Sequence, residues 1–206
     1  MNRFDEQTHT YWLGKNGSER RVPSVTQVLG GVIGQSWYAS DFHLNRGSAV
    51  HACCAFVARG IKFDHDSRIT GQIAACRRFL REFDCKVIEI EEPHFSERYQ
   101  YAGTPDLIAG IGDKARVVID YKASLTPMID LQLGGYGELV NVNWGLGVEL
   151  HEDGTYKTTR MIDLRRPRRE FLTLRSAFQI LTRLNRIKEG NDVERTTDTI
   201  DACTGA

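Results

Sequence analysis

The 206-residue sequence has no long hydrophobic run, and its apolar stretches fall short of the ~20 residues that a membrane-spanning helix requires. Its first residues also lack the apolar segment of a secretory signal peptide. The nucleotide-binding pattern G-x-x-x-x-G-K-[ST] is missing as well. From these absences we expect a cytoplasmic protein that has no membrane partner and does not itself use ATP for unwinding.

Cysteine is scarce, and none of the five cysteines forms a C-x-x-C pair. An odd number of cysteines argues against a closed disulfide framework, so we expect reduced thiols. Structural zinc is disfavoured for the same reason, because such sites usually contain paired cysteines.

The sequence has no overall excess of charge, since its 27 basic residues balance 27 acidic ones. The distribution is uneven, however, because residues 156–190 contain ten basic and three acidic residues. A local excess of this size could neutralise DNA phosphates, and Arg165, Arg166, Arg168 and Arg169 are its densest part. A solvated helical face is the alternative interpretation of the same charges.

The hydrophobic pattern predicts a single α/β domain over residues 1–190, because no linker or internal repeat divides the chain. Within this domain we expect a mixed central sheet flanked by helices. The expected parts are an N-terminal hairpin and short helix over 1–35, a core over 36–150, a hairpin and basic helix over 151–190, and a flexible tail over 191–206.

Local signals predict individual elements. Asn16-Gly17 is typical of a hairpin turn, and Ser24 with Gln27 forms the pattern of a capping box that opens a helix ending at Gly30-Gly31. The remaining pattern predicts a helix from about Trp37 to Arg59, a helix opened by Asp66 or Ser67, strands over 86–92, 95–101, 104–111 and 116–122, a helix over about 129–144, a hairpin of 147–150 with 156–164, and a helix ending near Gly190.

The strand from Val117 to Lys122 changes character at its end. Alternation places Val118, Asp120 and Lys122 on one face and the other apolar residues on the opposite face. A charge that emerges from a buried strand costs free energy unless it is paired or binds a metal. An ion pair between Asp120 and Lys122 is therefore one explanation, and a metal site is another.

Asp106 lies fourteen residues before Asp120, at the start of the preceding expected strand. If the two strands are adjacent and antiparallel, the two carboxylates come together and repel each other unless a hard cation lies between them. Mg²⁺ held by such carboxylates can orient a hydrolytic water and neutralise a phosphate. Lys122 could stabilise the developing charge or help to deprotonate the water.

The sequence Pro105-Asp106, followed by Asp120-Tyr121-Lys122, resembles the signature of the PD-(D/E)xK nuclease superfamily. Two further motifs are similar to those of its RecB-like and Cas4-like exonuclease branch, namely G-x-x-x-H at Gly47 to His51 and Q-x-x-x-Y at Gln132 to Tyr136. The motifs occur in the order of that branch over about residues 23–140. The resemblance implies a restriction-endonuclease-like core with the element order αβββαβ.

The resemblance also implies roles for the residues at the strand ends. Asp106 and Asp120 would ligate a metal, together with the backbone carbonyl of Tyr121, and Lys122 would be the catalytic lysine. Glu92 would be an additional acidic ligand, with Glu89 and Glu91 as alternatives for that role.

Three residues on the flanking helices correspond to the other motifs. His51 matches a residue that contacts metal or phosphate, and a core histidine is the alternative. Gln132 and Tyr136 lie at i and i+4 on one helical face and would position the substrate or the catalytic side chains. Packing of the tyrosine beside a surface glutamine is the alternative for this pair.

The expected cofactor is Mg²⁺ or Mn²⁺. Some relatives in this branch bind an iron-sulfur cluster through four cysteines, three of them near the C-terminus. This chain has only Cys203 there, so no iron-sulfur cluster is expected.

From these features we predict a Mg²⁺-dependent deoxyribonuclease, and the resemblance favours an exonuclease of recombination or repair in a bacterial or phage-infected cell. DNA is the expected partner, and a recombination or helicase protein and further copies of the chain are additional candidates. An endonuclease using the same site, a non-catalytic DNA-binding subunit of a nuclease complex, and a metal hydrolase for small phosphate esters are the alternatives.

Overall fold

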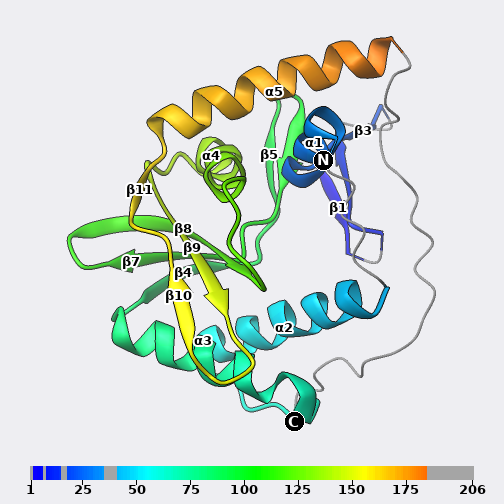
Figure 1. Ribbon diagram of the computed structural model, residues 1–206. Helices are drawn as coiled ribbons and strands as arrows, with labels where there is room; N and C mark the ends of the chain where they lie inside the picture. Colours follow the sequence, from blue (N-terminus) through cyan, green and yellow to red (C-terminus); the bar gives the residue numbers. More distant parts are fainter. Residues whose placement is uncertain (1, 7, 15–17, 35–40, 185–206) are drawn as a thin grey trace.

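A computed structural model describes residues 2–6, 8–14, 18–34 and 41–184, except for the side chains of 41–45. Within these ranges the chain forms a mixed central sheet with helices packed on both faces, as Figure 1 shows. This confirms the predicted α/β class. No helix in the described ranges is long and apolar enough to cross a membrane.

The main sheet follows the order β10-β9-β8-β7-β4. Strands β7 and β8 pair antiparallel, as do β4 and β7, whereas β8 and β9 run parallel and are joined through helix α4. The strands of this sheet are β4 (Lys86–Ile90), β7 (Leu107–Ile111), β8 (Lys114–Lys122), β9 (Trp144–Leu150) and β10 (Tyr156–Thr158), with β11 (Ile162–Asp163) pairing the start of β9.

Helices cover the sheet in two layers. One face packs against α2 (Asp41–Arg59) and α3 (Thr70–Glu82), which follows the short 3-10 helix η1 (Ser67–Ile69). The other face packs against α4 (Ile129–Leu139), α5 (Arg165–Arg183) and α1 (Val25–Ile33). The sequence α3, β4, β7, β8, α4, β9 matches the predicted order αβββαβ.

Strand β8 separates the two hydrophobic cores, as its alternation predicted. Val117, Ile119 and Tyr121 pack in the core beneath α2 and α3, whereas Val118 packs in the core beneath α4 and α5. Because Asp120 follows Val118 at a spacing of two, its side chain points toward the α4 layer.

Two small sheets lie beside the main sheet. The first contains β1 (Arg3–Asp5), β2 (Thr10–Leu13) and β3 (Arg20–Val22), and its β2–β3 pairing confirms the predicted hairpin. The second is a hairpin of β5 (His94–Ser96) and β6 (Tyr101–Gly103).

The hairpin of β5 and β6 replaces the single strand that was predicted over 95–101, so that prediction was wrong. The chain turns after Ser96 because its carbonyl accepts a hydrogen bond from the Gln100 N–H at 2.8 Å and its hydroxyl accepts one from the Tyr99 N–H at 3.1 Å. Gln100 completes the turn with a φ of 54°.

Several element ends also differ from the prediction. Ser24 and Gln27 form the expected capping box, but α1 continues past Gly30-Gly31 and ends at Gly34, whose φ is 70°. Helix α4 ends well before Trp144, because Asn141 adopts a φ of 51° and the chain re-enters the sheet as β9. Trp37, the end of the last helix near Gly190 and the tail over 191–206 lie outside the described residues.

Candidate active site

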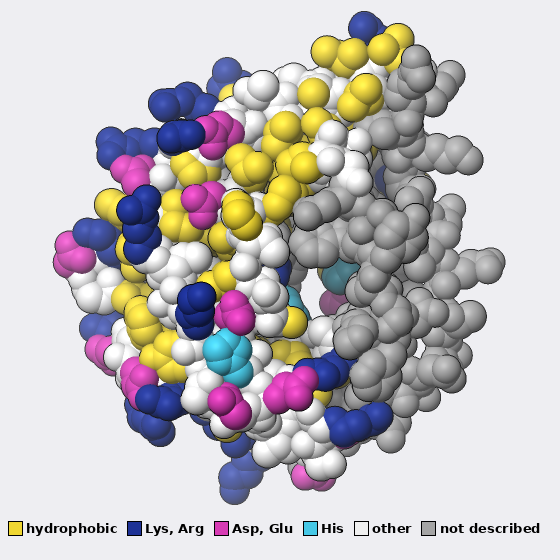
Figure 2. Space-filling model, viewed as in Figure 1, with side chains coloured by type: hydrophobic (Ala, Val, Ile, Leu, Met, Phe, Trp, Pro, Cys, Tyr) yellow, Lys and Arg dark blue, Asp and Glu magenta, His cyan; other side chains and the backbone are white. Residues whose placement is uncertain are grey.

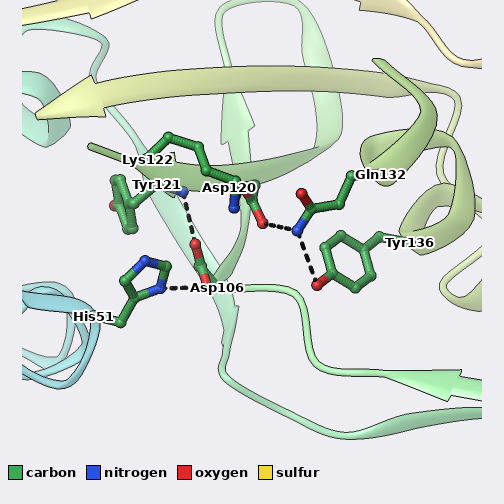
Figure 3. A network of polar contacts seen from close by, with 7 residues as sticks. All are labelled: His51, Asp106, Asp120, Tyr121, Lys122, Gln132 and Tyr136. Carbon is green, nitrogen blue, oxygen red and sulfur yellow. Dashed lines mark hydrogen bonds and ion pairs between the residues drawn. The ribbon is translucent and has the colours of Figure 1, made fainter. Parts of the chain in front are cut away.

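The ends of β7 and β8 bring two carboxylates together. Leu107 pairs with Ile119 in the antiparallel register, so Asp106, directly before β7, and Asp120, directly after Ile119, lie at the same end of the sheet. Figure 3 shows both side chains between a residue of α2 below and two residues of α4 beside them. The prediction that adjacent strands place these aspartates together is thus confirmed by the pairing.

Asp106 is held by two contacts from different elements. Its Oδ1 lies 2.9 Å from Nδ1 of His51 on α2, and its Oδ2 accepts a hydrogen bond from the backbone N–H of Tyr121 at 2.6 Å. Burial raises the pKa of Asp106, but the charge and hydrogen bond of His51 outweigh this effect and leave the pKa below its usual value. The pKa of His51 is correspondingly raised, because the attraction of Asp106 outweighs the opposing effect of burial.

Glu91, directly after β4, completes a group that could bind a cation. One ligand atom each from His51, Glu91 and Asp106 lie within 4.8 Å of one another, and no other group of three such residues occurs in the described part of the chain. Burial and then the negative charge of Asp106 raise the pKa of Glu91. A divalent cation between these carboxylates would relieve their repulsion, and an oxygen-rich set with one imidazole suits Mg²⁺ or Mn²⁺.

Asp120 and Lys122 form an ion pair, as the non-metal explanation of the strand end predicted. Asp120 is 1% exposed. Burial, reinforced by the nearby charge of Asp106, raises its pKa to about 6 although Lys122 acts in the opposite direction. The pKa of Lys122 is raised as well, because its attraction to both aspartates outweighs burial. The pair therefore lies within the electrostatic field of Asp106 and belongs to the same site.

Gln132 and Tyr136 act on Asp120 from α4. The Nε2 group of Gln132 donates to Oδ1 of Asp120 at 3.0 Å and to the hydroxyl of Tyr136 at 3.2 Å. Both side chains are buried, and burial raises the pKa of Tyr136 well above its usual value. The i, i+4 spacing thus brings both residues to one point, and the alternative of a surface glutamine beside a packing tyrosine was wrong.

The side chains of Tyr121 and Glu92, two further predicted metal ligands, lie outside the group of His51, Glu91 and Asp106. The Tyr121 ring is buried on the α2 side of the sheet, with its centroid 6.5 Å from that of His51, and the role of its carbonyl as a ligand stays a prediction. Glu92 is exposed and lies outside the group of His51, Glu91 and Asp106.

The sequence resemblance favoured Glu92 for this role and kept Glu89 and Glu91 as alternatives, whereas Glu91 is the glutamate that lies beside Asp106. The signal for Glu91 is its register: Ile90 pairs with Leu107, so the next residue lies opposite Asp106. That signal can be used only if the pairing of β4 with β7 is known. The sequence does not indicate this pairing, because the hairpin of β5 and β6 lies between the two strands.

The four arginines predicted to bind DNA lie at the start of α5. Arg165 pairs with Asp163 and Arg166 pairs with Glu170, and Figure 2 shows basic and acidic side chains next to one another at the upper left of the molecule. Arg169 is exposed.

Arg168 has a structural role in the same segment. Its guanidinium donates to the carbonyls of Gly137 at 3.1 Å and Val142 at 2.8 Å, and it pairs with Glu138. These contacts satisfy carbonyls at the C-terminal end of α4.

Comparison with known proteins gives no family assignment. No protein-family model matches the sequence, and no curated protein matches it. Several solved structures show weak similarity, and three of them follow. These are LHK-Exo in complex with dAMP (15% identity, 80% of this chain and 93% of that chain, TM-score 0.40), the alkaline exonuclease LHK-Exo from Laribacter hongkongensis (15%, 79% and 92%, 0.39) and SSO0001 (19%, 50% and 54%, 0.37).

The alignment with SSO0001 thus spans about half the length of that protein. Similarity at this level does not assign an activity, so the function has to be argued from the chemistry of the site.

Proposed function

We propose that this protein is a metal-dependent DNA nuclease that hydrolyses phosphodiester bonds where β7 begins and β8 ends. The observation that carries the proposal is the meeting of His51, Glu91 and Asp106 with the Asp120–Lys122 pair at one point of the fold. A purely structural ion pair would need neither the half-buried carboxylate of Asp106 beside it nor a second carboxylate within 4.8 Å of that one.

The residues present suit Mg²⁺ or Mn²⁺. Asp106, Glu91 and His51 would hold the ion, and Asp120 is close enough to Asp106 for the charge of Asp106 to raise its pKa. Asp106 is already oriented by the Tyr121 N–H and by His51, so its carboxylate needs little rearrangement to bind a cation. A bound Mg²⁺ or Mn²⁺ would supply positive charge for the scissile phosphate and acidify the hydrolytic water.

The remaining side chains provide charge and orientation. The Lys122 ammonium, kept protonated by its two aspartate neighbours, can stabilise negative charge that develops on a phosphate. Gln132 fixes Asp120 through its amide hydrogen bond, and Tyr136 fixes Gln132. The hydrogen bonds from Gln132 would keep the Asp120 carboxylate in place if Lys122 leaves its ion pair with Asp120 and turns toward the substrate.

The finer assignment rests on the sequence motifs. Their resemblance to the RecB-like branch favours an exonuclease over an endonuclease and favours a role in recombination or repair, with a helicase or recombination protein as a partner. The neutral overall charge gives no independent argument for DNA, so the substrate class also rests on the nuclease motifs and on the phosphate chemistry of the site.

The test is a cleavage assay with linear and covalently closed DNA, single-stranded and double-stranded, in EDTA and in MgCl₂ or MnCl₂. We expect cleavage of linear DNA only, and only with metal. Asp106→Asn and Lys122→Met should each reduce the rate by about 100-fold or more, because each removes a charge that acts on the reacting phosphate. Asp113→Asn is the matched control, because that carboxylate pairs with Lys114 in an exposed turn.

Each other outcome contradicts a part of the proposal. Cleavage of closed circles identifies an endonuclease and rejects the exonuclease assignment. DNA binding without cleavage in either metal identifies a non-catalytic binding subunit. Parental rates in both the Asp106→Asn and Lys122→Met variants reject the site itself.

A further inference from the structure

The N-terminal sheet is attached to the segment that precedes Asp106. Ser24 forms a parallel bridge with Ala102, and the Ala102 N–H donates to the carbonyl of Pro23 at 3.0 Å. The chain leaving β3 therefore runs beside β6, four residues before Asp106. Nothing in the proposed chemistry uses this sheet, although it lies against the backbone of the site.

A single side-chain hydrogen bond extends this attachment toward the carboxylate. The Tyr11 hydroxyl on β2 lies 2.8 Å from Oγ1 of Thr104. The Tyr11 ring is 4% exposed and is held by stacking on Phe4 at 4.7 Å and by an edge contact with Phe95 at 5.9 Å between ring centroids. Burial raises the pKa of Tyr11 to about 12, so its hydroxyl stays protonated at neutral pH.

Thr104 is not part of a strand. It lies between the end of β6 and the start of β7, and the following residue, Pro105, has no N–H to donate. Thr104 therefore has no strand pairing to hold it, and its hydrogen bond to Tyr11 fixes the chain two residues before Asp106.

The same segment also contacts the side of the site that holds Asp120. A Cβ placed on Gly103 would lie 2.8 Å from Cε1 of Tyr136, so backbone and ring are in close contact there. Because Tyr136 accepts a hydrogen bond from Gln132, a shift of this segment would act on the contact that orients Asp120 as well.

We propose that Tyr11 is a positioning residue of the nuclease site, which acts through Thr104 to hold the Asp106 carboxylate in place. The inference rests on the proposed function, and it assigns the N-terminal sheet to the active site rather than to a separate packing unit. Loss of the Tyr11 hydroxyl leaves Thr104 without this partner, and displacement of a catalytic group by 1 Å can cost about 100-fold in rate.

The test compares Tyr11→Phe, Thr104→Val and the double variant in cleavage of linear DNA with MgCl₂. We expect each single variant to lower kcat by about 10-fold while KM for DNA changes by less than about 2-fold, because the substrate contacts are retained. The double variant should equal the single ones, since all three remove the same hydrogen bond. Tyr156→Phe is the control, because its hydroxyl bonds to Glu82 on α3 at 2.5 Å, away from the site.

A second readout does not depend on DNA cleavage. Calorimetric titration of the metal-free protein with MnCl₂ should show affinity reduced about 3-fold or more in Tyr11→Phe and Thr104→Val, and unchanged in Tyr156→Phe. If Tyr11→Phe keeps the kcat and the Mn²⁺ affinity of the parent protein, the inference is overturned. A lower melting temperature of this variant would then show that Tyr11 has only a packing role.

The two proposals fail in distinguishable ways. If the parent protein does not cleave DNA but Tyr11→Phe weakens Mn²⁺ binding, the nuclease function is rejected and the positioning of the metal ligands stands. If the parent cleaves DNA and neither kcat nor Mn²⁺ affinity responds to Tyr11→Phe, the nuclease stands and the positioning role is rejected.

Discussion

Glu91 and Glu92 are neighbours in the chain, yet only Glu91 is near Asp106. Glu91 follows the last residue of β4 and adopts a φ of 49°, a conformation that is uncommon outside glycine. In this conformation its N–H donates to the carbonyl of Asp106 at 3.2 Å. Unusual backbone conformations of this kind cluster at functional sites, where the surrounding contacts hold them.

The two glutamates provide a matched pair of substitutions. Glu91→Gln should weaken Mn²⁺ binding by about 10-fold or more, because it removes a charged ligand, whereas Glu92→Gln should leave the affinity within about 2-fold. Titration calorimetry of both variants against the parent measures this difference. Equal affinity losses in the two variants, or a loss confined to Glu92→Gln, would restore Glu92 as the ligand.

Helix α4 shows which contacts of an element can be predicted from its local sequence and which cannot. The motif Q-x-x-x-Y correctly placed Gln132 and Tyr136 on a common face, because a helix repeats at that spacing whatever lies around it. Of the two glycines between them, Gly134 is on the opposite side, where a Cβ would lie 2.5 Å from the backbone of Pro167 on α5. No local pattern announces this close approach of two helices.

Gly134 and Gly47 therefore predict opposite effects of the same substitution. Gly134→Ala should destabilise the protein by about 1–3 kcal/mol, because α5 must move away from α4. Gly47→Ala, in α2, should stabilise it by about 0.5–1 kcal/mol, since no described atom lies within 4 Å of the added carbon and alanine favours the helix. Urea unfolding of both variants measures the two changes. A loss at Gly47 similar to that at Gly134 would show that the glycine of the G-x-x-x-H motif is also needed for packing.

Long-range pairing limited what the sequence could predict. The hairpin of β7 and β8 follows from a short turn, so the meeting of Asp106 and Asp120 was predictable. The pairing of β4 with β7 crosses the inserted β5–β6 hairpin, so the approach of Glu91 was not. The contact of Tyr11 with Thr104 spans 93 residues and carries no sequence signal of its own.

At the scale of the whole molecule, the basic start of α5 and the candidate site lie at opposite ends of β9. Asp163, two residues before Arg165, pairs with Trp144, whereas Lys122 pairs with Glu149. The five residue steps from Trp144 to Glu149 extend ~17 Å along a strand. A duplex advances about five base pairs over that distance, so a DNA molecule in the site is long enough to reach α5.

The predicted role of these arginines can be tested by replacing the three exposed ones. The triple variant Arg165→Gln, Arg166→Gln, Arg169→Gln should bind a duplex of about 20 base pairs more weakly and with a smaller salt dependence, because fewer phosphates are neutralised. Mn²⁺ affinity should not change, because the metal ligands are elsewhere. Arg168 is retained in this variant because it holds the end of α4. Parental affinity and salt dependence would identify the basic segment as a solvated surface.

Strand β4 ends beside the proposed metal ligands, and it is the last strand in the order of the main sheet. Val87 and Ile88 are exposed on this strand at 39% and 46%, a combination that would ordinarily invite another chain to add a strand. The register shift between Val87 and Glu89 and the exposed charge of Lys86 oppose such pairing. The irregular strand that delivers Glu91 to the site thereby also protects the protein against edge-to-edge aggregation.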